Sequence, residues 1–188
     1  MLKTLVKIDA VKQLQNARYA AGMGVELIGF SIDKDSPNFM DSTNLTELTQ
    51  WLSGVKIVGE LADNQTVVNQ DYKLNYLQTS NKDSISQLKK QSIPLILAVQ
   101  NLENLESILN EHKANVSYFL ISLNTQTTTK ELDWLKELAK QYPLLLKGVS
   151  QQNVEQVLEQ VQPQGITLQG NENIDALADV LELIELED

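Results

Sequence analysis

The sequence predicts a single-domain α/β protein, residues 1–188, whose parallel strands close into a (βα)8 barrel of the TIM type. Short segments rich in Leu, Ile and Val alternate along the whole chain with amphipathic segments of helical period. Strands that are apolar on both faces and joined by helices are typical of a parallel sheet covered on its outside. About eight such repeats favour a closed barrel over an open sheet, which usually has about five or six strands.

The apolar segments place the eight strands at residues 4–9, 25–31, 55–61, 73–78, 94–99, 117–123, 144–147 and 165–168. Helices are predicted where apolar residues recur every three or four positions, as at Leu102, Leu105 and Leu109. The same pattern marks helices near residues 11–23, 45–52, 132–138, 154–161 and 174–186. A helix near residues 65–71 has the weakest pattern because that stretch is short and polar, and the polar stretch 124–129 is interpreted as a loop after the sixth strand.

Composition narrows the class of protein. The net charge of -10 repels phosphate backbones and anionic membranes, so we expect neither nucleic acid nor a membrane surface as a partner. The absence of cysteine excludes disulfides and thiolate metal sites, and no signal peptide or membrane-spanning run is recognisable. We therefore expect a cytoplasmic protein without a metal or cofactor, and leave its oligomeric state open, a homo-oligomer included.

Two charged residues stand out at the end of the first strand. Lys7 and Asp9 are two positions apart, so a strand projects both side chains from the same face. Burial would raise the pKa of the Asp9 carboxyl and suit it to act as a base, whereas a nearby ammonium would lower that pKa. The alternative interpretation is an ion pair that fills the barrel mouth.

Short motifs recur in a fixed order along nearly the whole chain. The first strand ends in Lys7-Ile8-Asp9-Ala10, and AAGMGVE (20–26) and IGF (28–30) follow it. Further motifs are DSPNF (35–39), VGEL (58–61), LQTSN (77–81), LDW (132–134), KGV (147–149) and NV (153–154). Together they resemble the phosphoribosylanthranilate isomerase family, (βα)8 enzymes of tryptophan biosynthesis, which read Lys-Ile-Cys-Gly at the first strand and Ile-Gly-Phe at the second.

The resemblance implies an Amadori rearrangement of a phosphorylated ribosylamine, which needs a general base and a general acid. The family's base is the cysteine of its first strand, and that position is Asp9 here. The family's acid is an aspartate at the end of the sixth strand, and that position is Ser122. A serine hydroxyl does not donate its proton readily at neutral pH, so we expect isomerase activity to be weak or absent.

The resemblance also implies the positions of substrate contacts. The family's arginine corresponds to Asn38, and its histidine corresponds to Ser80. A phosphate would lie at the loops after the seventh and eighth strands, where Lys147, Gly148 and Gly170 stand. The only arginine, Arg18, and the only histidine, His112, lie in predicted helices, and we expect both at the surface.

Three functions remain open at this point. The first is a divergent isomerase-like barrel, a pseudoenzyme that binds a small phosphorylated or sugar-like anion. The second is an active sugar-phosphate isomerase that uses Asp9 as base and a relocated acid. The third is a non-catalytic interaction protein whose barrel mouth is filled by side chains such as those of Lys7 and Asp9.

Overall fold

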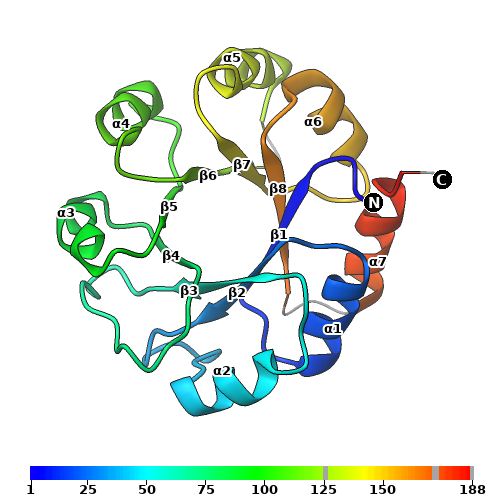
Figure 1. The fold of residues 1–188 in the computed structure, drawn as a ribbon. Coiled ribbons are helices and arrows are strands. Elements are labelled where there is room, and N and C mark those ends of the chain that lie inside the picture. The colour runs from blue at the N-terminus through cyan, green and yellow to red at the C-terminus, as the bar shows by residue number, and fades with distance from the viewer. Residues whose placement is uncertain (125–126, 171–173, 187–188) are drawn as a thin grey trace.

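The computed structural model describes residues 1–124, 127–170 and 174–186, and it is a closed barrel of parallel strands (Figure 1). Each strand pairs with the next in sequence, and β1 closes the barrel by pairing with β8. The predicted fold is thereby confirmed. The strands are β1 (Leu5–Asp9), β2 (Leu27–Ser31), β3 (Lys56–Glu60), β4 (Tyr76–Thr79), β5 (Leu95–Val99), β6 (Tyr118–Ser122), β7 (Leu144–Lys147) and β8 (Gly165–Gln169).

Helices surround the barrel on its outside (Figure 1). Their apolar faces pack on the strands, as in α6, where Val154, Val157 and Val161 are buried. The best-formed start is that of α5, where Thr128 and Glu131 form a reciprocal capping box. The helices are α1 (Leu14–Gly22), α2 (Ser42–Thr49), α3 (Ile85–Leu88), α4 (Leu105–His112), α5 (Thr129–Ala139), α6 (Val154–Val161) and α7 (Ile174–Leu183).

The prediction of a helix at residues 65–71 is wrong, because the segment between β3 and β4 has no helix. Side chains satisfy its backbone instead. Gln91 accepts a hydrogen bond from the Val68 N–H at 3.0 Å and donates one to the Thr66 carbonyl at 3.2 Å. Within residues 65–71, Val68 is the one buried side chain, and it packs in the core beside Leu77. Of the predicted loop at 124–129, residues 125 and 126 lie outside the described residues.

Arg18 is exposed as expected, but the prediction of a surface position for His112 is wrong. His112 ends α4 and is buried with Leu105 and Leu109. The spacing of these three residues places them on one helical face, which packs against the barrel. The histidine is therefore part of the packing between α4 and the strands. It does not belong to the rim formed by the strand ends.

The inside of the barrel changes character along its axis. Its apolar part consists of Leu27, Val58, Ile96, Leu120 and Leu145. Because side chains alternate across each strand, β1 directs Leu5, Lys7 and Asp9 inward in turn. The interior is therefore apolar toward the strand starts and charged toward the strand ends. In the described residues no helix is long and apolar enough to cross a bilayer.

Candidate functional site

The ends of the parallel strands form one rim, which is where barrels of this type carry their sites. Asp9 ends β1, Glu60 ends β3, Ser122 ends β6 and Lys147 ends β7. In register, Ser122 pairs with Lys147 on the neighbouring strand. The two positions that the resemblance assigns to base and acid, Asp9 and Ser122, therefore belong to the same opening.

Four charged side chains form a connected network at this opening. The Lys7 ammonium, fully buried, contacts the Asp9 carboxylate and lies 3.0 Å from Glu60 Oε1. The other oxygen of the Asp9 carboxylate, Oδ2, lies 2.8 Å from the Lys147 ammonium. Two lysines and two carboxylates thus balance each other, and the chain of contacts runs Lys147–Asp9–Lys7–Glu60. We call these four residues the rim network.

The backbone is shaped around Glu60. Both of its carboxylate oxygens lie 3.1 Å from the Ala10 nitrogen, which donates its N–H to them. Ala10 has a φ of 53°, a left-handed conformation that is strained for a residue with a Cβ. On the intervening strand, a Cβ at Gly29 would lie 2.9 Å from both Glu60 Cδ and Lys7 Nζ. Because Gly29 has no side chain, Glu60 of β3 and Lys7 of β1 can meet across β2.

The contacts within the rim network shift the pKa values of three of its members. Burial alone would raise the pKa of Asp9, but the Lys7 and Lys147 ammonium groups outweigh it and hold that pKa below its ordinary value. Burial lowers the pKa of Lys7, yet the charges of Asp9 and Glu60 outweigh it, so the pKa of Lys7 is raised. The pKa of Glu60 is raised by burial, with a further contribution from the Asp9 charge, against the opposing effect of Lys7.

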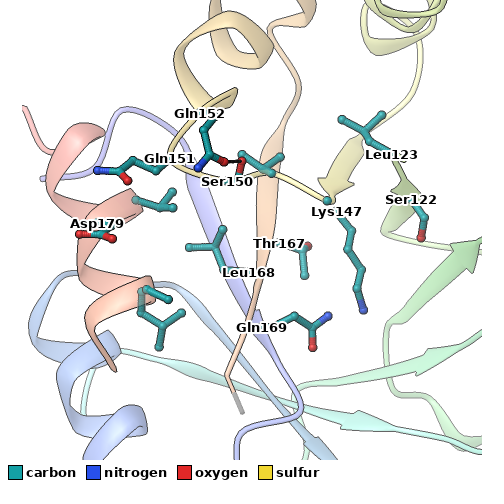
Figure 2. A pocket seen from close by; sticks show the side chains of 15 residues that line it. Ser122, Leu123, Lys147, Ser150, Gln151, Gln152, Thr167, Leu168, Gln169 and Asp179 are labelled. Atoms are coloured by element: carbon teal, nitrogen blue, oxygen red, sulfur yellow. Dashed lines mark hydrogen bonds between the residues drawn. The ribbon is translucent and has the colours of Figure 1, made fainter. Parts of the chain in front are cut away.

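A cavity of about 500 Å³ opens beside the network, between β7, β8, the loop before α6, and α7 (Figure 2). Figure 2 shows Lys147, Thr167 and Gln169 on the barrel side of this cavity and Asp179 on the α7 side. Gly148 lies in its lining with a φ of 87°, and a Cβ there would meet the Leu123 carbonyl oxygen at 2.5 Å. Only glycine fits this turn after β7 without strain.

Two backbone N–H groups in the loops after β7 and β8 are used within the protein, including that of Gly170, which was predicted to contact a phosphate and does not line this cavity. The N–H of Gly170 donates to the Asp9 carbonyl at 2.6 Å, and the Gly170 carbonyl accepts from Asn16 at 2.9 Å. The N–H of Ser150, in the loop after β7, donates to Asn153 Oδ1 at 2.7 Å. Gly170 thus locks the end of β8 onto β1, whereas Lys147 and Gly148 face the cavity.

A smaller cavity of about 130 Å³ lies on the other side of Lys147 and includes Gln78, Ser80 and Ser122 in its lining. The Ser80 hydroxyl donates to the carboxylate of Asp63, so Ser80 is brought to the same opening as Lys147. Asn38 lies in the loop after β2, where its N–H donates to Ser36 Oγ at 3.1 Å, and it lines neither of these two cavities.

Sequence reasoning did not include three polar groups of the opening among the site residues. Glu60 is a charged residue that ends an apolar strand, which is the same signal that identified Asp9. Thr167 is buried, and in the described part of the chain neither its hydroxyl nor the Oε1 atom of Gln78 has a hydrogen-bond partner. Unsatisfied polar atoms beside a cavity favour a ligand or water at that place. Across the described ranges, no cluster of three or more His, Asp or Glu side chains has the arrangement of a metal site.

No protein-family model and no curated protein sequence matches this chain. Solved structures do match. Phosphoribosylanthranilate isomerase from Thermotoga maritima aligns over 95% of this chain and 97% of its own, with a TM-score of 0.79 and 18% identity. The enzyme from Thermus thermophilus aligns over the same shares with a TM-score of 0.76 and 18% identity.

A third structure, phosphoribosyl anthranilate isomerase from Thermococcus kodakaraensis, covers 98% of this chain and 100% of its own, with a TM-score of 0.72 and 16% identity. The structural match establishes the fold, but identities this low leave the activity open. The resemblance found in the sequence is thereby confirmed for the fold, and this chain has the barrel of the phosphoribosylanthranilate isomerases over nearly its whole length.

Proposed function

We propose that this protein binds a small phosphorylated or sugar-like anion at the rim of the barrel and has little or no phosphoribosylanthranilate isomerase activity. The proposal combines a cavity in the right place with a poor set of groups for proton transfer. The cavity of about 500 Å³ lies at the loops after β7 and β8, and Lys147 supplies it with a positive charge. A (βα)8 barrel commonly binds phosphate at these loops.

The observation that carries the proposal is the state of Asp9. A carboxylate held between two ammonium groups, with a lowered pKa, is a weak base for removing a proton from carbon. Ser122, at the position of the family's acid, ends β6 without an acidic proton to donate. The rim thus offers a cavity next to a lysine, whereas Asp9 and Ser122, at the two proton-transfer positions, are poorly suited to act as base and acid.

Complementation tests the catalytic half of the proposal. The protein is expressed in a tryptophan auxotroph that lacks the isomerase, beside an active isomerase as the positive control. We expect no growth without tryptophan. Robust growth at normal expression would contradict the loss of activity.

Calorimetric titration tests the binding half. The first probe is reduced 1-(o-carboxyphenylamino)-1-deoxyribulose 5-phosphate, which is bound in one similar structure, and the second is inorganic phosphate. We expect saturable binding of the first probe that Lys147→Met weakens. Lys140→Met is the matched control, because Lys140 follows α5, is exposed, and in the part of the chain that the structure describes forms an ion pair only with Glu137. If both variants bind the first probe with equal affinity, Lys147 takes no part in binding.

A second candidate function, an active isomerase with Asp9 as base, has one observation in its favour. Glu60 has a raised pKa and contacts Lys7, which also contacts Asp9. It is therefore a candidate for the relocated acid. Purified protein that turns over the substrate, with turnover abolished by Asp9→Asn, would support this candidate. Turnover retained in Asp9→Asn would exclude it.

A further inference from the structure

We infer that Lys147 reacts through its side-chain amine with the carbonyl group of a small aldehyde or ketone, forming an imine at the barrel rim. Lys147 ends β7 and lines both the larger and the smaller cavity, so a ligand in either one lies beside its side chain. Its side chain is 34% exposed, so it is partly open to solvent. Lys7, by contrast, is fully buried and bound to two carboxylates, so it cannot approach a ligand.

The reaction requires the ammonium group to lose a proton. The free amine then attacks the carbonyl carbon, the carbonyl oxygen takes up a proton, and a carbinolamine results. The nitrogen gives up its remaining proton as the hydroxyl group leaves as water, and a carbon–nitrogen double bond remains. Amine and carbonyl compound thus give imine and water, with no oxidant or reductant.

The rim network offers the proton a continuous route. Lys147 Nζ lies 2.8 Å from Asp9 Oδ2, the other Asp9 oxygen contacts Lys7, and Lys7 lies 3.0 Å from Glu60. Shifting one proton along this chain leaves Lys147 neutral and Glu60 protonated, while the sum of the four charges stays at zero. Because burial raises the pKa of Glu60, this carboxylate is the acceptor in the network that most readily takes a proton.

Two residues with hydroxyl groups lie on either side of Lys147. Ser122 on β6 and Thr167 on β8 both pair in register with Lys147, and Figure 2 shows them on either side of its side chain. Thr167 is buried, and among the described residues its hydroxyl has no partner. We expect this hydroxyl to donate a hydrogen bond to the carbonyl or carbinolamine oxygen, which would satisfy a polar group that is otherwise costly to bury.

Reductive trapping tests the inference. The full-length protein is incubated with dihydroxyacetone, or with dihydroxyacetone phosphate, in the presence of sodium borohydride, and the adducts are measured by intact mass and peptide mapping. We expect one main adduct, on Lys147, formed at least about ten times faster than on exposed lysines, because a cavity holds the carbonyl compound beside this side chain. Adducts spread over the lysines according to their exposure would overturn the inference.

Two variants separate chemistry from folding. Lys147→Arg keeps a positive charge beside Asp9 but cannot form an imine, so we expect the adduct to disappear while the melting temperature is kept. Lys140→Arg is the control and should leave the Lys147 adduct unchanged. Glu60→Gln removes the final proton acceptor, so trapping at Lys147 should slow at neutral pH; an unchanged rate would contradict the proton route.

The inference goes beyond the proposed function and can fail separately from it. It requires access to Lys147 but no anion site, so dihydroxyacetone and its phosphate test the two independently. Labelling of Lys147 by both compounds, without calorimetric binding of phosphate, would keep the imine and remove the anion site. If Lys147→Met weakens anion binding but no selective adduct forms on Lys147, the anion site is kept and the imine is ruled out.

Discussion

Replacement of Gly29 by alanine tests whether the rim network is as closely fitted as the structure shows. The new Cβ would lie 2.9 Å from Glu60 Cδ and from Lys7 Nζ, well inside a normal contact. Both groups are the ends of flexible side chains, so they can move, but only by giving up their partners. Glu60 would leave the Ala10 N–H, and the Lys7–Glu60 contact of 3.0 Å would open.

The expected cost follows from those partners. Breaking a buried ion pair costs about 3–5 kcal/mol. The alanine recovers up to about 1 kcal/mol, because glycine weakens a strand interior. We therefore expect Gly29→Ala to lower the free energy of unfolding by about 2–4 kcal/mol. In a protein of this size that corresponds to a fall in melting temperature of about 5–15 °C.

Urea unfolding followed by circular dichroism measures the effect. The matched control is Gly22→Ala at the end of α1, where a Cβ meets nothing within 4 Å and alanine should stabilise by up to about 1 kcal/mol. In a Glu60→Ala background the main obstacle is gone, so adding Gly29→Ala should cost about 2 kcal/mol less than in the wild type. A loss below about 0.5 kcal/mol in the single variant would refute the close fit, since surface changes also fall in that range.

Three further predictions concern stability. Ala10→Gly should raise the free energy of unfolding by about 1 kcal/mol, because it relieves a left-handed backbone conformation; a loss in urea unfolding would contradict that strain. Thr128→Ala should cost about 1 kcal/mol by removing the capping box of α5, and no change in the same assay would show the cap to be unimportant. Because the pKa of Asp9 is lowered in the folded state, its contribution to stability is complete above the unfolded pKa and disappears as pH falls through the folded one. Unfolding measured from pH 7 down to about 2 should therefore show a loss below about pH 4 that is smaller in Asp9→Asn; equal losses would exclude this role. Glu60, whose pKa is raised, contributes in the opposite sense, with stability present below its unfolded pKa and lost as pH rises through the folded one.

The sequence was sufficient for the barrel because the alternation of apolar strands and amphipathic helices is a local pattern. Each of the eight strands overlaps the apolar segment that predicted it, although β4 begins at Tyr76 and not at residue 73. The helix predicted at residues 65–71 failed because side chains from elsewhere, such as Gln91, satisfy the backbone of that segment. His112 was misplaced because a polar residue on the buried side of α4 runs against the usual pattern of burial.

The site was predictable only where it depends on one strand. The period of two in a strand brings Lys7 and Asp9 together, and the structure shows them in contact. The contact of Lys7 with Glu60 depends on a neighbouring strand that carries glycine at position 29, and Lys147 reaches Asp9 from β7. Such contacts require the closed barrel, which the sequence predicts as a topology without giving distances between side chains.

The helix-free connection between β3 and β4 has a consequence for how the barrel opens. Elsewhere an outer helix must detach before strand amides meet solvent, but here mainly Val68, Tyr72 and Leu74 cover the wall. Protection from hydrogen exchange reflects the packed surface that must be disrupted, so the amides of β3 and β4 should exchange first under native conditions. Glu60 lies at the end of β3, so the weakest part of the wall adjoins the charged rim, and a ligand bound there should slow exchange in these two strands more than elsewhere.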